Sequence, residues 1–511
     1  MYQELGNILS KVKQSAKQHN WATGVMQSEK VIDHDSCYPD GNLSFASYYG
    51  DHMVLQKSPE RAVLWGYGPE GAQVTVDLSG PVNQESLVVN VTKGIWYATL
   101  APVEAGGPYN VTASNENGTA TLKDVLFGDV WLCGGQSNMC FETYKIFNAS
   151  EELALAAKYP HVRTFMVALE KSETELTDLI KVELPWSVPT ATNVGKFSAV
   201  CWLFGRYLNE HLKYPIGLVR SCWGGTPIED WSSSRALQEC GLEQNGRQGN
   251  SVLWNSMIHP LLKMTIKGAI WYQGESNTGL NQDKYNCSFP AMIDDWRMAF
   301  HEGSGGQTAH DFPFGFVQLS TFIKGSTLDG MPNIRWHQTA DFGFVPNPRM
   351  QKTFMAVALD LPDERSPYHP IHPRDKQDVA FRLTLGAKAV AYNETDVPFQ
   401  GPFPEKITST SMYLNITYDQ TVSVKPSANT FEAPCGPTSH WVAVPITQWD
   451  STTVQVSANL CSLPDEVAAL RYAWRDWPCD FKACPIYSTS GILPAPPFIV
   501  SRYQGDAWES Q

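Results

Sequence analysis

Four short apolar segments of this chain each run into a loop rich in glycine, asparagine or histidine, and helical patterns lie between them. The segments cover residues 125–132, 216–219, 269–272 and 354–360, the first with a Gly128-Asp129 interruption. Apolar runs of this length are typical of strands covered on both faces, and strands that alternate with helices form a parallel sheet. The pattern therefore predicts an α/β domain with its functional residues at the carboxyl edge of the sheet.

The loop after the first segment carries a serine. Gly134 and Gly135 permit backbone angles that other residues avoid, so the chain can turn sharply there and expose Ser137. The loop does not match the G-x-S-x-G elbow of lipases, because the residue two after the serine is Met139. By itself, this composition fits a structural turn as well as a nucleophile.

Three loops further along the chain favour the nucleophile. They read Trp-Gly-Gly-Thr-Pro-Ile-Glu at 223–229, Trp-Tyr-Gln-Gly-Glu-Ser-Asn at 271–277 and Ile-His-Pro-Arg-Asp-Lys at 371–376. Together with Gly-Gln-Ser-Asn-Met at 135–139, these blocks resemble those of the SGNH hydrolase superfamily and, within it, of the sialate O-acetylesterase family. The resemblance extends from about Phe45 to about Ile499.

The resemblance implies a serine esterase that hydrolyses O-acetyl esters of sialic acids, the 9-O-acetyl ester favoured, through an acetyl-enzyme that releases acetate. It implies no cofactor and no metal, and an O-acetylated sialic acid, free or linked to a glycan, as the partner. The implied fold is a three-layer α/β/α domain of the SGNH type with a parallel sheet, flanked by N-terminal and C-terminal β domains. Two alternatives stay open: an acetylesterase for another carbohydrate such as xylan, and an inactive glycan-binding protein, which the presence of Ser137 and His372 disfavours.

Within this resemblance, Ser137 attacks the acetyl carbonyl, and His372 takes the serine proton and returns it to the departing sugar oxygen. A histidine suits this exchange because its unperturbed pKa is ~6.5. His369 lies only three residues away, but the Ile-His-Pro block selects His372.

The resemblance also implies donors for the oxyanion of the tetrahedral intermediate. These are the backbone N–H of Ser137, that of Gly224 or Gly225, and a side-chain amide in the third block. Gln273 and Asn277 both carry such an amide, and the sequence does not choose between them. Glu275 is expected either to orient the site or simply to accept hydrogen bonds from loop amides.

The acid of a triad is the weakest part of the match. Many SGNH enzymes place an aspartate three residues before the histidine, and His369 occupies that position here. We therefore expect either a Ser–His dyad or an acid that reaches His372 through space, with Asp360 and Asp363 as candidates. Arg374 could bind the carboxylate of sialic acid, although a surface position in a first helical turn is the simpler explanation.

The length predicts more than one domain, because 511 residues exceed the ~250–300 at which a single core stops growing. We expect a poorly ordered N-terminal extension at 1–40, a β-sandwich-like domain at 41–122, the esterase domain at 123–395 and a C-terminal β region at 396–511. Helices are expected at 151–158, 199–212, 251–264, 291–300 and 375–391.

Charge and hydropathy exclude two classes of partner. A net charge of -14 with no basic stripe argues against nucleic acid, whose phosphates need clustered Lys and Arg. No apolar run approaches the ~20 residues that span a bilayer, so membrane insertion is not expected.

Cysteines and sequons favour a lysosomal or secreted glycoprotein. The 11 cysteines cannot all pair, so at least one is free or intermolecular. Cys435, Cys461, Cys479 and Cys484 lie close together in the last part of the chain, where Cys479 and Cys484 are spaced to close a local disulfide. Eight asparagines precede x-Ser or x-Thr: Asn42, Asn90, Asn110, Asn117, Asn148, Asn286, Asn393 and Asn415. The first residues, however, lack a signal peptide, so we expect an alternative or mispredicted first exon, or else a cytosolic form.

Overall fold

The structure, a computed structural model, describes residues 42–243, 249–410, 412–434, 440–459, 467–502 and 508–510. The expectations for residues 1–40, for Cys435 and for Cys461 lie outside these residues.

The first strands form two antiparallel groups. In one group, β3 lies between β1 and β6, and in the other, β4 lies between β5 and β7. Their apolar residues alternate, as in β4, where Val74, Val76 and Leu78 are buried and the intervening side chains are more exposed. The bounds are β1 (Ser44–Phe45), β3 (Val63–Tyr67), β4 (Gln73–Ser79), β5 (Leu87–Asn90), β6 (Ile95–Thr99) and β7 (Gly106–Asn115).

A central sheet follows, in the order β10-β9-β11-β8-β12-β13-β14. All neighbouring strands in this order are parallel except β10 and β9, which are antiparallel. The bounds are β8 (Gly118–Gly135), β9 (Val162–Val167), β10 (Val182–Ser187), β11 (Ile216–Cys222), β12 (Gly268–Tyr272), β13 (Phe314–Gln318) and β14 (Thr353–Val357). The short β2 (Val54–Gln56) also pairs with β8.

Strand β8 belongs to both parts of the chain. Its first half pairs with β7, and from Asp129 onward it pairs with β11. The expected boundary between residues 122 and 123 therefore lies inside one continuous strand. At Gly128, an added Cβ would lie 1.8 Å from the carbonyl oxygen of Pro215, so the Gly-Asp interruption in the apolar pattern reflects a close backbone approach rather than a chain break.

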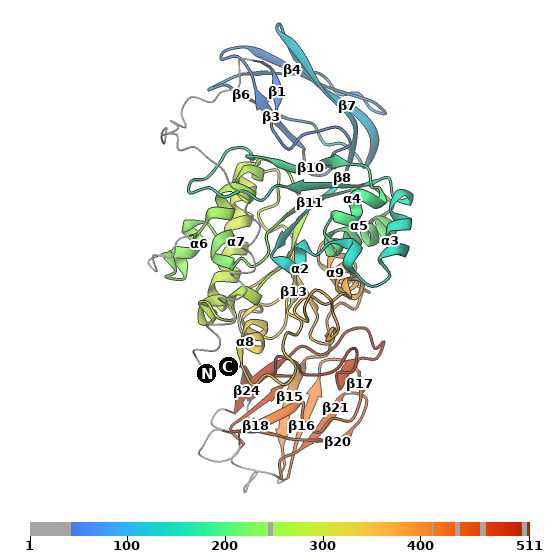
Figure 1. Cartoon of the computed structure of the whole chain (residues 1–511), viewed down its shortest axis with the longest axis vertical. Helices are drawn as coiled ribbons and strands as arrows, with labels where there is room; N and C mark the ends of the chain where they lie inside the picture. Colours follow the sequence, from blue (N-terminus) through green and yellow to red (C-terminus); the bar gives the residue numbers. More distant parts are fainter. Residues whose placement is uncertain are drawn as a thin grey trace, which may run out of the picture. The chain divides into compact units, whose positions relative to one another are not determined.

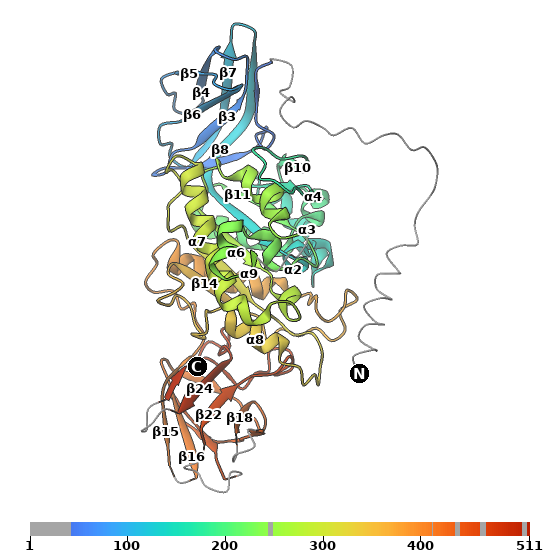
Figure 2. The same ribbon diagram turned by 90° about the vertical axis from the view of Figure 1, so that its left-hand side faces the viewer.

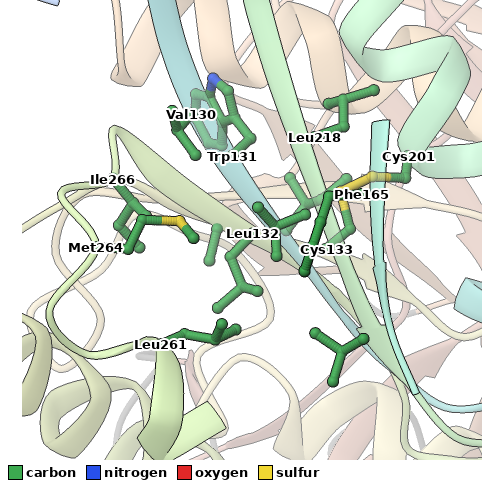
Figure 3. Close-up of a cluster of buried hydrophobic side chains, with 14 of the residues drawn as sticks. Val130, Trp131, Leu132, Cys133, Phe165, Cys201, Leu218, Leu261, Met264 and Ile266 are labelled. Atoms are coloured by element: carbon green, nitrogen blue, oxygen red, sulfur yellow. A yellow bond between two sulfur atoms is a disulfide. The ribbon is translucent and has the colours of Figure 1, made fainter. Parts of the chain in front are cut away.

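Helices cover both faces of the central sheet. Figures 1 and 2 show α3, α4, α5 and α9 on one side and α6 and α7 on the other. Figure 3 shows the same division around β8, where Cys133 bonds to Cys201 of α5 while Leu261, Met264 and Ile266 lie opposite. The expected mixed α/β fold is thus confirmed. The bounds are α3 (Ala149–Leu155), α4 (Ala191–Lys196), α5 (Ala199–Leu212), α6 (Ser234–Glu239), α7 (Tyr285–Gly303), α8 (Gly330–His337) and α9 (Lys376–Val390).

Two expected helices differ from the structure. The segment 251–264 is not one regular helix, because a π-helical turn, η5 (Trp254–Ile258), passes into a 3₁₀ turn, η6 (His259–Leu261). Pro260 has no N–H for an α-helical bond at this point. Helix α7 begins at Tyr285, earlier than the expected residue 291, and contains Pro290.

The C-terminal region is built from β strands around a second core that includes Phe431, Tyr472 and Phe498. The orders are β15-β16-β21-β20, β17-β23 and β19-β18-β22-β24-β25. The bounds are β15 (Pro404–Ser409), β16 (Tyr413–Tyr418), β17 (Val422–Val424), β18 (Phe431–Pro434), β19 (Trp441–Ala443), β20 (Ile446–Trp449), β21 (Thr453–Ser457), β22 (Ala469–Tyr472), β23 (Ile486–Ser488), β24 (Phe498–Arg502) and β25 (Trp508–Ser510). This bears out the expected C-terminal β structure.

Disulfides connect elements that are distant in sequence. Those among the described residues are Cys133–Cys201, Cys140–Cys222, Cys240–Cys287 and the expected Cys479–Cys484. Within the same residues, no helix combines the length and apolar character needed to cross a membrane.

Candidate active site

Ser137 stands at the first position of α2 (Ser137–Cys140), directly after β8. Gly135 has φ +140°, and an added Cβ would lie 2.2 Å from the carbonyl oxygen of Tyr272, so only glycine fits this turn. The N–H of Gln136 donates to that same carbonyl at 2.9 Å. The end of β12 therefore fixes the turn that presents Ser137, whose side chain stays partly exposed.

His372 lies within hydrogen-bonding distance of the serine. Its Nε2 is 2.9 Å from Ser137 Oγ, and its Nδ1 is 2.6 Å from the carbonyl oxygen of Tyr368. Because a carbonyl oxygen can only accept, Nδ1 must carry the proton, which leaves Nε2 free to accept the serine hydroxyl proton. This tautomer is the one a general base needs.

The surroundings of His372 favour its uncharged form. Burial lowers its pKa, the Tyr368 carbonyl opposes this, and the positive charge of Lys376 lowers the pKa further. The ring of Phe141 stacks beside the imidazole, with centroids 6.3 Å apart and planes 22° apart. A neutral imidazole next to a serine hydroxyl is the arrangement that activates a nucleophile.

The loop of the second block, residues 223–229, borders Ser137. A Cβ added to Gly224 would lie 3.4 Å from the Cβ of Ser137, so the Gly224 backbone passes beside the serine. Gly225 has φ +73° and open space around its Cα, so its conformation rather than crowding favours glycine there. The N–H of Trp223 donates to the carbonyl of Gly135 at 3.0 Å, which ties this loop to the serine turn.

Gln273 and Asn277 lie beneath these loops, and their amides already have partners. Asn277 Oδ1 accepts from the N–H of Ile228 at 3.0 Å and from Gln273 Nε2 at 2.8 Å. Asn277 Nδ2 donates to Glu229 Oε2 at 3.0 Å. Gln273 is fully buried and Asn277 is 1% exposed. Both amides thus hold the second loop against the third.

The structure does not place Asp360 beside His372, in contrast to the expectation from sequence. Its two oxygens accept from Arg382 Nη1 at 2.6 Å and Nη2 at 2.9 Å, and Tyr487 donates to it at 2.9 Å. The carboxylate is fully buried. A bidentate guanidinium is the stronger partner for a buried carboxylate, and α9 supplies one.

Asp363 and Arg374 pair with each other. Arg374 Nε and Nη2 lie 2.7 and 3.0 Å from the two oxygens of Asp363. Burial alone would raise the pKa of Asp363, but hydrogen bonds from Arg374 hold it below its usual value. The structure thus pairs these two side chains with each other, and neither is shown in contact with His372.

Of the polar residues under the serine, the sequence singled out Glu275 but neither Asn138 nor Lys376. Asn138 Nδ2 donates to Glu275 Oε1 at 2.6 Å and to the carbonyl of Ile371 at 2.9 Å, and Asn138 Oδ1 accepts from Lys376 Nζ at 2.9 Å. All three side chains belong to the conspicuous blocks, but nothing in one sequence shows that a lysine in such a block is fully buried.

Two family models match the chain. Residues 127–370 match the model described as carbohydrate esterase, sialic acid-specific acetylesterase. Residues 405–502 match the sialate O-acetylesterase C-terminal domain.

Curated relatives match nearly the whole length. The sialate O-acetylesterase of Mus musculus is 50% identical over 510 residues, covering 89% of this chain and 94% of the mouse protein. That of Homo sapiens is 51% identical over 482 residues, covering 89% of this chain and 92% of the human protein.

A solved structure shares the arrangement of this chain. The crystal structure of a carbohydrate acetylesterase from Xanthomonas citri superposes with a TM-score of 0.77 at 29% identity, covering 90% of this chain and all of that one.

Proposed function

The chain belongs to the sialate O-acetylesterase family, and on this premise we propose that Ser137 and His372 hydrolyse O-acetyl esters of sialic acid in this protein. The 2.9 Å contact between His372 Nε2 and Ser137 Oγ carries the proposal, because it joins a nucleophile to a base of the required tautomer.

The reaction proceeds in two halves. Ser137 Oγ attacks the acetyl carbonyl carbon as its proton passes to His372 Nε2, and the resulting imidazolium gives that proton to the sugar oxygen as the C–O bond breaks. A water molecule then attacks the acetyl-enzyme and loses its proton to Nε2. The proton returns to Ser137 Oγ as acetate leaves, which restores the starting state.

Backbone N–H groups stabilise the oxyanion in this proposal. Those of Ser137, at the start of α2, and of Gly224, beside the serine, are the candidates, with Gly225 as the neighbouring alternative. Gln273 and Asn277 support the Gly224-Gly225 loop from below rather than donating directly, because their amide hydrogens have other acceptors.

The site works as a dyad in this proposal. The Tyr368 carbonyl does the orienting that a triad carboxylate does elsewhere, and Asp360 serves an ion pair with Arg382. The order of the strands supports an SGNH-type arrangement, with the serine after the central β8 and the histidine in the loop between β14 and α9.

Substrate position and cellular route are finer parts of the proposal. We favour the 9-O-acetyl ester, since a serine that is only partly exposed suits an ester on a mobile side chain more than one on a sugar ring. The four disulfides found among the described residues support passage through an oxidising compartment to the lysosome or the outside of the cell.

The test is acetate release from 9-O-acetylated sialic acid by the full chain beside Ser137→Ala and His372→Ala. We expect rapid release by the unmodified protein and a loss of about 10³-fold or more in kcat for either variant. Lys388→Met, on the far end of α9, is the control and should keep full activity. Release from acetylated xylan but not from the sialic acid would overturn the substrate, and an active Ser137→Ala would overturn the site.

A further inference from the structure

Three buried polar side chains lie beneath the proposed nucleophile and base. They are Asn138 of α2, Glu275 of η7 (Glu275–Asn277) and Lys376 at the start of α9, with exposures of 1%, 8% and 0%. Burying charged groups is costly unless their hydrogen-bonding capacity is used. Their presence therefore calls for an explanation.

The flanking charges dictate the orientation of the Asn138 amide. Its Nδ2 donates to Glu275 Oε1, and its Oδ1 accepts from Lys376 Nζ. A carboxylate can only accept and an ammonium can only donate, so a flipped amide would lose both bonds. The two charged residues thus fix which way Asn138 points.

The fixed amide joins the two loops that carry the chemistry. Asn138 follows Ser137 directly, and its Nδ2 also donates to the carbonyl of Ile371, the residue before His372. One side chain therefore connects the serine turn to the histidine loop through the backbone on each side. Catalysis is sensitive to such alignment, since a displacement of about 1 Å can reduce the rate ~10²-fold.

Lys376 has an environment that suits a buried cation only in part. Its Nζ lies 5.0 Å from the ring centroid of Phe141 and 5.3 Å from that of Tyr272, and its hydrogen bond goes to a neutral amide. Burial lowers its pKa to about 7, while Glu275 acts in the opposite direction. Burial also raises the pKa of Glu275, one of whose oxygens lacks a hydrogen-bond partner.

We propose that Lys376, Asn138 and Glu275 form a positioning bridge that holds the Ser137 turn and the His372 loop in register. In this proposal the Lys376 ammonium, which lies over the Phe141 ring that stacks beside the imidazole, opposes a positive charge on His372. The inference rests on the proposed roles of Ser137 and His372. None of the three bridge residues touches the reacting atoms.

The electrostatic effect of Lys376 on His372 can be tested separately from its positioning role, because the other charged neighbours of the imidazole are known. Lys376 on α9, His369 in the same loop and Lys145 of η1 (Thr143–Lys145) all lower the pKa of His372. Phe141 and the Tyr368 carbonyl, which also face the ring, carry no charge. Removing the Lys376 charge should therefore raise the pKa of His372.

The experiment uses the full chain and the pH dependence of kcat/KM for 4-nitrophenyl acetate. In Lys376→Met, the acid limb should move to higher pH by on the order of one unit, because a like charge near the imidazole is gone. In Asn138→Ala, kcat should fall by about 10²-fold with KM nearly unchanged, because alignment rather than binding is lost.

Lys388→Met is the matched control, since it removes a partly exposed lysine from the last turn of the same helix. It should leave both the pH profile and kcat at their original values. Thermal melting of each variant shows whether it folds, and the pH dependence of labelling by a fluorophosphonate, which reacts with the activated serine, gives a second readout.

The outcomes distinguish a failure of the proposed bridge from a failure of the proposed function. An Asn138→Ala variant that folds and keeps the original kcat overturns the bridge, and so does a Lys376→Met variant with an unchanged acid limb. If Lys376→Met does not fold, Asn138→Ala decides alone. If Ser137→Ala stays active, the proposed function itself fails, whatever the bridge variants do.

Discussion

His372 Nδ1 donates to a backbone carbonyl, and this partner determines how well the site can stabilise an imidazolium. The Tyr368 oxygen fixes the tautomer as a carboxylate would, but it brings no full negative charge to stabilise an imidazolium. A second hydrogen bond, from Ser366 Oγ to the His372 carbonyl at 2.7 Å, also ties the histidine loop to itself. Asp360, the acid that the sequence favoured, pairs with Arg382, and a substitution can test whether it also takes part in catalysis.

Asp360→Asn should reduce stability and spare catalysis. The change leaves the Arg382 guanidinium, only 4% exposed, without its counter-charge, and breaking a buried pair in this way costs about 3–5 kcal/mol. Chemical denaturation should show this loss, while kcat for 4-nitrophenyl acetate at a temperature where the variant is folded should match the unmodified protein.

Asp363→Asn is the control for this prediction. Asp363 is itself 7% exposed, but its partner Arg374 is 26% exposed and can be hydrated when the pair is lost, so the cost should be smaller than for Asp360→Asn. A stable Asp360→Asn protein whose kcat drops by ~10⁴-fold would instead identify Asp360 as a triad acid.

The sequence predicted the residues whose signal is local and missed those whose role depends on distance in space. Ser137 and His372 stand in short blocks, and the occurrence of four such blocks in one order marks them. The Asp360 assignment depended on the direction of a buried side chain after β14, which Arg382, 22 residues further along, decides. The burial of Lys376 follows from the packing of Phe141 and Tyr272 around it, which one sequence does not reveal.

At the scale of elements, one disulfide holds the nucleophile helix. Helix α2 has four residues, too few to be stable alone, and its last residue, Cys140, bonds to Cys222 at the end of β11. Gly224 follows Cys222 by two residues. The bond therefore connects the serine turn to the loop that borders it, in addition to the Trp223–Gly135 backbone bond.

Removing this disulfide should lower kcat as well as stability. Replacing Cys140 and Cys222 by serine releases a cross-link across 82 residues, with an entropic effect of about 4–5 kcal/mol. The double variant Cys240→Ser/Cys287→Ser, which separates α6 from α7, should lose about 4 kcal/mol of stability yet keep kcat. Melting and acetate release measured on both pairs test this, and equal kcat in the two double variants would contradict the positioning role.

The elements themselves were predicted where their pattern is periodic. The expected helix at 199–212 is α5, and that at 375–391 is α9 to within a residue at each end. The pattern failed at 251–264, where a π-helical turn passes into a 3₁₀ turn that contains Pro260. It also placed a domain boundary between residues 122 and 123, inside β8, and treated Gly128 as an interruption, since a glycine that admits a neighbouring backbone looks the same in a sequence as one that weakens a strand.

At the scale of the whole molecule, the central α/β part and the C-terminal strands share buried groups. Arg335 of α8 is fully buried and donates to the carbonyls of Leu319 and Ser320 on one side and of Arg475 and Asp476 on the other. Asp476 in turn accepts from the N–H groups of Phe322 and Ile323. Trp336 packs edge-on against Trp474 beside this group.

Arg335→Met should therefore loosen the C-terminal region from the catalytic part. Four carbonyl oxygens lose a charged donor, and leaving buried acceptors unpaired costs at least about 3 kcal/mol in total. Hydrogen exchange followed by mass spectrometry should show faster exchange in β22 and in the segment 319–323, with little change in β8 and β11. Arg349→Met, which removes an exposed pair with Asp294, should leave exchange in these segments unaltered. Uniformly faster exchange across the chain would mean that Arg335 supports global stability rather than this junction.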